Sequence, residues 1–168
     1  MSNNGILNLQ QMAARYAIED IFGACLVYFH SASGNSASML TFSGRISFYE
    51  VLLVKKGRME VCVGDNNITL QAGDLLLLTP FQPVVTRPTD THTEVEGLLI
   101  ETHFYAGLRS IDRETDVMMP TVITHSNLVF HLDHHQTSSF IELLHQIKQV
   151  VRQPHLYKLE ILQSLVHV

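Results

Sequence analysis

Apolar and polar residues alternate in short segments between about residues 21 and 105, and turn residues separate these segments. Within one segment, Met59, Val61 and Val63 share one parity while Arg58 and Glu60 share the other. This period of two is typical of a β-strand with one buried face. Short strands with a turn signal about every ten residues indicate an antiparallel sandwich or barrel.

Turn signals fix the order of the predicted strands. Gly57 and Gly73 lie in tight turns, where a positive φ costs glycine little. Leu75–Leu78 is apolar at both parities, so we expect this strand to be covered on both faces. The predicted strands are 46–54, 59–63, 68–70, 75–78, 84–87 and 94–104. The predicted inward-facing apolar residues are Leu52, Val54, Met59, Val61, Leu75 and Leu77.

Both ends of the chain have helical spacing of apolar residues. Residues 6–16 predict a short N-terminal helix, and 139–152 and 154–168 predict two longer helices. Ser139 and Glu142 have the spacing of a capping box at the start of the first of these two. Pro154 suits the first position of the second, where a proline loses no hydrogen bond.

The composition argues against a nucleic-acid-binding, membrane-spanning or secreted protein. Net charge is −5, and the eleven Lys and Arg residues are scattered, so this chain alone is not expected to bind nucleic acid. Apolar residues make up 46% and charged residues 16%, which favours some apolar surface covered by a partner. No apolar run is long enough to cross a membrane, and the N-terminus lacks a signal-peptide pattern. Cys25 and Cys62 lie in apolar stretches and are expected to be buried free thiols in a cytoplasmic protein.

Four residues carry a resemblance to known proteins. Glu50, Gly57, Gly73 and Pro80 follow one another on strand–turn–strand signals. This order resembles the cupin superfamily and, more closely, the N-terminal effector-binding domain of AraC-type transcription regulators. The resemblance implies a mainly β fold with C-terminal helices, namely a double-stranded β-helix (jelly-roll barrel) followed by an antiparallel helix pair. The segments that carry it are 48–54, 71–78 and 80–83.

The resemblance also implies an organisation. Residues 1–136 would form the effector-binding barrel, and 137–168 the dimerisation helices of the same domain, so that the protein is a homodimer through 139–168. The helical pattern reaches Val168 without a cap, so we expect a truncated chain that lacks the DNA-binding domain.

The family's metal-binding histidines have no counterparts here. The segment 41–46 before Glu50 contains no His, and Val84-Val85 stands where the third would lie. One carboxylate cannot hold a catalytic metal without imidazole partners. We therefore expect no metal, no cofactor and no catalytic residue. The histidines at 131, 134 and 135 show no closed metal motif and are expected to be solvated.

Ligand binding remains possible at a few polar positions. If Glu50 faces inward, it is a partly buried carboxylate that needs a hydrogen-bond donor. That donor would be Arg45 or another basic side chain, or a hydroxyl or amine of a ligand. His103 shares strand parity with Glu101 and could face the barrel mouth. The candidate ligand-binding residues are Arg45, Tyr49, Glu50, Arg87 and His103.

Three hypotheses follow. The first is a sensor whose barrel binds a small-molecule effector of unknown identity and whose helices dimerise, with DNA bound only by a further domain. The second is a stand-alone cupin-fold enzyme, an isomerase or dioxygenase, against which the missing histidines argue. The third is a structural dimer whose barrel is filled by its own side chains.

Overall fold

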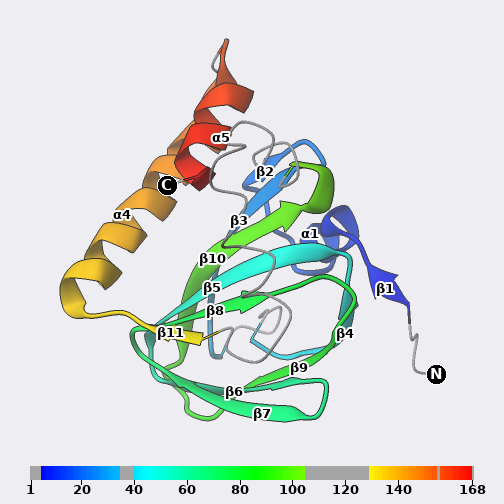
Figure 1. Cartoon of the computed structure of the whole chain (residues 1–168), viewed down its shortest axis with the longest axis vertical. Helices are drawn as coiled ribbons and strands as arrows, with labels where there is room; N and C mark the ends of the chain where they lie inside the picture. Colours follow the sequence, from blue (N-terminus) through cyan, green and yellow to red (C-terminus); the bar gives the residue numbers. More distant parts are fainter. Residues whose placement is uncertain (1–4, 35–39, 105–128, 155, 168) are drawn as a thin grey trace, which may run out of the picture.

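Two sheets face each other and are flanked by helices (Figure 1). The computed structural model describes residues 5–34, 40–104, 129–154 and 156–167. The strands of the first sheet, in spatial order, are β1 (Ile6–Leu7), β4 (Phe42–Ile46), β9 (Pro83–Pro88), β6 (Arg58–Val63) and β7 (Asn66–Gln71). Those of the second are β11 (Val129–His131), β8 (Asp74–Leu78), β5 (Phe48–Lys56), β10 (Glu94–Glu101), β3 (Leu26–Ala32) and β2 (Ile21–Phe22). The helices are α1 (Leu9–Arg15), α4 (His134–Arg152) and α5 (Lys158–His167).

This architecture confirms the predicted fold class. Every strand pair is antiparallel except β1 with β4, and the two sheets enclose one apolar core. The predicted N-terminal helix is shorter than expected, because Ile6–Leu7 pairs with β4 and the helix begins only at Leu9. Gly57 and Gly73 have φ of 74° and 92°, as their turns require.

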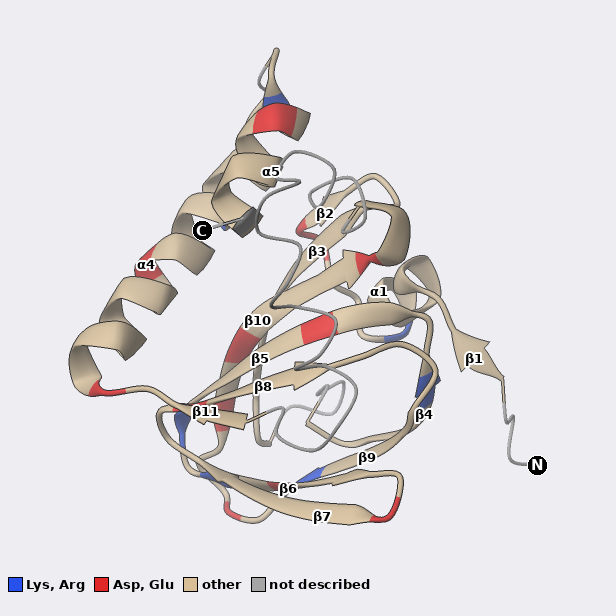
Figure 2. Ribbon diagram, in the orientation of Figure 1, with Lys and Arg blue, Asp and Glu red and all other residues tan. Residues whose placement is uncertain are grey.

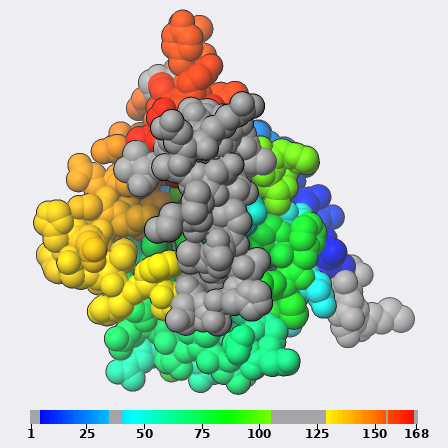
Figure 3. Space-filling view, viewed as in Figure 1, coloured from blue at the N-terminus to red at the C-terminus, as the bar shows by residue number. Residues whose placement is uncertain are grey.

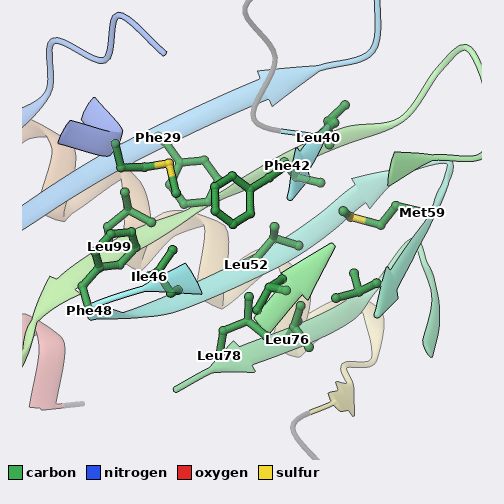
Figure 4. Close-up of a cluster of buried hydrophobic side chains, with 14 of the residues drawn as sticks. Phe29, Leu40, Phe42, Ile46, Phe48, Leu52, Met59, Leu76, Leu78 and Leu99 are labelled. Carbon is green, nitrogen blue, oxygen red and sulfur yellow. The ribbon is translucent and has the colours of Figure 1, made fainter. Parts of the chain in front are cut away.

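Apolar side chains of both sheets point into the space between them and form the main core cluster (Figure 4). In β6, Met59, Val61 and Val63 are buried, which confirms the predicted alternation. In β8 the predicted parity is wrong, because Leu76 and Leu78 lie in the core and Leu75 and Leu77 do not. The core residues labelled in Figure 4 are Phe29, Leu40, Phe42, Ile46, Phe48, Leu52, Met59, Leu76, Leu78 and Leu99.

The strand β10 carries apolar residues on both faces, and both faces are covered. The barrel core covers one face and the helices cover the other. Leu99 points into the barrel core, whereas Leu98 and Ile100 belong to a second cluster beneath α4. Gly97 lies on β10 between β5 and β3, and the backbone of β5 and a phenylalanine ring of β3 come very close to it. A Cβ there would lie 1.9 Å from the Val51 carbonyl oxygen and 2.9 Å from Phe29 Cζ, so only glycine fits.

The helices α4 and α5 pack side by side, and α4 lies along the outer face of the second sheet (Figure 1). In the space-filling view the orange α4 lies at one side of the molecule and the red α5 lies above it (Figure 3). From these helices, Leu144, Ile147, Val151 and Leu162 are buried in the second cluster. The side chain of Arg152 binds the Asp20 carboxylate and ties the end of α4 to the segment before β2. In the part of the chain that the structure describes, no helix is long and apolar enough to span a membrane.

The start of α4 differs from the prediction. The helix begins at His134, with Asp133 as N-cap and Gln136 closing the capping box, rather than at Ser139 with Glu142. The polar first turns are solvent-exposed, so no apolar residue marked them in the sequence. The predicted domain boundary at 136/137 therefore falls inside α4. The second helix also starts later than predicted, at Lys158, and Pro154 lies in the connection.

Asp133→Ala is expected to lower the free energy of unfolding by about 1 kcal/mol, because it removes the acceptor for the Gln136 N–H. The matched control is Ser139→Ala, at the position where the sequence had suggested the cap. Since Ser139 is exposed inside the helix, this control should change stability by less than about 0.5 kcal/mol. Urea unfolding followed by far-UV circular dichroism distinguishes the two positions, and equal effects would contradict the assignment of the cap.

Candidate functional site

The carboxyl group of Glu50 lies inside the barrel. Successive side chains of a strand point to opposite faces, and Glu50 shares its face with Phe48 and Leu52, both in the barrel core. On the neighbouring strands its register partners are Leu78 of β8 and Leu99 of β10. Only 8% of Glu50 is exposed. A single ionisable group therefore projects into apolar surroundings.

Burial raises the pKa of Glu50 to about 7, since the charged carboxylate is less stable away from water. No hydrogen bond or neighbouring charge of the described residues offsets this effect. Tyr16, at the end of α1, lies near enough for the Glu50 charge to raise its pKa, although burial contributes more. The Tyr16 hydroxyl donates to the Thr41 carbonyl oxygen at 3.2 Å.

The barrel supplies Glu50 with no cationic partner among the residues that the structure describes. No Lys, Arg or His in these ranges is buried. By contrast, the buried Thr86 hydroxyl has a partner, since it accepts from the Phe42 N–H at 3.1 Å.

Arg45 and Arg87 lie on the outer face of the first sheet. The Arg45 guanidinium donates to the Phe81 carbonyl oxygen at 2.8 Å, so the predicted pair between Arg45 and Glu50 is wrong. Arg87 lines a surface hollow of ≈ 340 Å³, and Arg45 lines a neighbouring one of ≈ 450 Å³. Cys62 and Val85 line both hollows. Both cysteines are free, as predicted, but Cys25 and Cys62 are half-buried rather than buried.

Tyr49 and His103 lie elsewhere again. Tyr49 is on the opposite face of β5 from Glu50 and packs against the second apolar cluster beneath α4. The predicted strand 94–104 ends at Glu101, whose carboxylate accepts the backbone N–H groups of His103 and Phe104 at 2.7 and 3.0 Å. His103 is therefore exposed in a helical turn and does not share the barrel face. Of the five candidates, Glu50 alone points into the barrel.

A polar cluster between the second sheet and α4 was not predicted. Its centre is Glu96 of β10, which is fully buried. The Tyr28 hydroxyl donates to Glu96 Oε1 at 2.7 Å, and Lys55 Nζ lies 2.9 Å from Oε2. From α4, His145 Nε2 lies 3.2 Å from Oε1, and Lys148 Nζ lies 4.8 Å from the centre of the Tyr28 ring. The cluster thus joins strand and helix.

Glu94 extends this cluster toward solvent. Its carboxylate lies 2.9 Å from His30 Nε2, 3.2 Å from Lys55 Nζ and 3.1 Å from Lys56 Nζ. These partners lower the pKa of Glu94 to about 2, and the hydrogen bond from His30 has the largest effect. Figure 2 shows the acidic positions of β5 and β10 on neighbouring strands. Glu50 and Glu96 nevertheless differ, because one faces the core and the other faces α4.

A second link to the helices starts at the turn before β8. His131 Nδ1 lies 2.7 Å from Asp74 Oδ1, and the Leu132 N–H donates to the Gly73 carbonyl oxygen at 2.9 Å. The predicted solvation of His131 is right, but its pairing with Asp74 was missed. Across the described ranges, no three His, Cys, Asp or Glu residues lie close enough together to hold a metal ion.

Known structures share this arrangement. No protein-family model and no curated protein matches the sequence. An apo variant of ToxT from Vibrio cholerae is similar with a TM-score of 0.57 and 14% identity, over 85% of this chain and 53% of that chain. ToxT bound to an unsaturated fatty acid gives 0.52 and 14%, over 84% and 50%. ToxT bound to (E)-4-(8-methylnaphthalen-1-yl)but-3-enoic acid gives 0.52 and 12%, over 84% and 53%.

These similarities establish the fold of the chain. It spans about half the length of the ToxT chains that it matches. The class defined by fold and site is therefore a jelly-roll barrel with a helix pair on its outer face and a buried carboxyl group inside, which has no partner among the described residues.

Proposed function

We propose that this chain is the ligand-sensing and dimerisation domain of a bacterial transcription regulator of the AraC type. The observation that carries the proposal is the shared arrangement of barrel and helices with ToxT, a regulator of the AraC family that binds fatty acids. A small molecule would bind inside the barrel beside Glu50. The protein would be cytoplasmic, and its DNA contacts would belong to a helix-turn-helix domain outside this chain.

The proposed role is binding and not catalysis. The enzyme hypothesis requires a set of groups that act together on a substrate. The five polar residues that the sequence suggested lie at separate places, and Glu50 stands alone among apolar side chains. A stand-alone isomerase or dioxygenase therefore has less support than a sensor.

Two links could carry a signal from the barrel to the helices. The strand β5 carries Glu50 and pairs with both β8 and β10. β10 contacts α4 through Glu96 and His145. β8 contacts β11 through Asp74 and His131, and His131 lies three residues before the start of α4. If β5 can occupy two slightly different positions, a ligand that binds one of them more tightly raises its population. Because β5 is linked to the helices through β8 and β10, the arrangement of the helices would change with it. We propose that this shift is what a DNA-binding domain would detect.

The helices would also hold two copies together. Leu156, Tyr157 and Leu159 form an apolar patch at and before the start of α5, with 98%, 68% and 42% of each residue exposed. Apolar side chains gathered at one place on a surface are typical of an interface. We therefore place the centre of the homodimer at this patch.

The double substitution Leu156→Ser, Tyr157→Ser is expected to weaken dimerisation by about ten-thousandfold or more. Each side chain removed from a buried interface costs about 1.5–3 kcal/mol per subunit, and both subunits change. Sedimentation equilibrium of the 168-residue protein measures the dissociation constant. The control is Ile6→Ser, an equally apolar residue with 49% exposure on β1, which lies away from α5 (Figure 1). A wild-type protein that stays monomeric at about 100 µM, or equal effects of both variants, would contradict the proposal.

A further inference from the structure

Among the described residues, the carboxyl group of Glu50 has no partner inside the barrel. A buried polar group ordinarily has a hydrogen-bond partner, because its desolvation is costly. Glu50 is more than nine-tenths buried and has neither a hydrogen bond nor an ion pair with the described residues. Its neighbours across the sheet, Leu78 and Leu99, offer no donor.

We propose that the ligand of this barrel is an apolar molecule carrying an ammonium or hydroxyl group, and that Glu50 binds that group. The inference rests on the proposed sensor function and adds the chemical class of the effector. The carboxyl group supplies the acceptor, and the core residues around Phe48 and Leu52 supply the apolar surface.

The same geometry disfavours ligands that carry a carboxylate. A carboxylate beside Glu50 would bring two negative charges together in apolar surroundings, where their repulsion is far stronger than in water. No buried Lys, Arg or His of the described ranges could offset that repulsion. In this respect the chain would differ from ToxT, whose bound molecules are an unsaturated fatty acid and a butenoic acid derivative.

An ammonium group gains most from this site. An ammonium group beside Glu50 would form a hydrogen-bonded ion pair with the ionised carboxylate. This pairing offsets the desolvation cost of burying that charge. A hydroxyl group gains less, because it donates one hydrogen bond without charge. The expected order of affinity at equal apolar size is therefore amine, alcohol, carboxylic acid.

Three probes with one alkyl chain test this order: octylamine, 1-octanol and octanoic acid. Each is titrated at pH 7.5 into the ¹⁵N-labelled 168-residue protein, and the backbone amides of β5, β8 and β10 are followed by NMR. We expect octylamine and 1-octanol to shift amides next to Glu50, and octanoate to bind at least about tenfold more weakly than octylamine. Glu50→Gln should reduce the preference for octylamine over octanoate by about tenfold or more while leaving 1-octanol nearly unchanged.

A matched control separates this effect from general attraction of amines to an acidic protein. Glu60→Gln removes the same charge at an exposed position on the outer face of the first sheet and should leave the preference unchanged. Octanoate binding as tightly as octylamine at these amides would overturn the inference and leave the proposed function standing. If none of the three probes shifts these amides, the barrel site itself, and with it the proposed function, is contradicted.

Discussion

Glu96→Ala is expected to lower the free energy of unfolding by about 3 kcal/mol, because it leaves the buried Tyr28 hydroxyl without its acceptor and removes one of the two carboxylates that pair with Lys55. The carboxylate lies 2.9 Å from Lys55 Nζ and accepts the Tyr28 hydroxyl at 2.7 Å. After the substitution, Tyr28 would keep a buried hydroxyl without an acceptor, and His145 of α4 would lose its contact with β10.

Urea unfolding followed by far-UV circular dichroism measures this loss, since the chain has no tryptophan to serve as a fluorescent probe. Glu96→Gln keeps an acceptor for Tyr28 and should cost about 1–3 kcal/mol, so it remains informative if the alanine variant does not fold. The control is Glu60→Ala, an exposed glutamate, with an expected change below about 0.5 kcal/mol. A loss under about 1 kcal/mol for Glu96→Ala would show that the cluster contributes little to the docking of α4.

The sequence predicted the barrel well because polar residues mark the outer face of most strands. The parity of Glu50 follows from Phe48 and Leu52, and the structure places it inside as that parity implies. In 75–78 four leucines in a row give no polar position to fix the parity, and the prediction chose the wrong pair. The start of α4 failed for a similar reason: two capping boxes fit the local pattern, and the exposed polar turns between Asp133 and Ser139 carry no apolar residue that would have extended the predicted helix.

The polar cluster at the joint of sheet and helix could not be predicted from local pattern. Tyr28, Glu96 and His145 come from two strands and a helix that are far apart in the sequence. One signal was present, because Glu96 interrupts a nearly continuous apolar run in 95–100. Such a charge in a two-sided buried strand requires a partner, although the sequence does not say which element supplies it.

Glu50→Gln is expected to raise the free energy of unfolding relative to the wild type by about 3 kcal/mol at pH 8. The pKa of Glu50 is about 7 in the folded protein and near 4.5 in the unfolded chain. The folded state therefore binds more protons between these values, so wild-type stability falls as the pH rises from 4.5 through 7. A difference of two to three pKa units corresponds to about 3 kcal/mol. Glutamine does not ionise and escapes this loss.

Replacing a carboxyl by an amide also changes stability by an amount that does not depend on pH. The decisive measurement is therefore the difference between E50Q and wild type at pH 8 minus the same difference at pH 4, where Glu50 is protonated in both states. Glu60→Gln, at an exposed position, should show no such dependence. A flat difference for E50Q would mean that Glu50 has a partner when folded, and the argument for an ammonium or hydroxyl ligand would lose its basis. An increase toward pH 8 would identify a group that costs the free protein stability, which is expected where a residue is retained for binding rather than for folding.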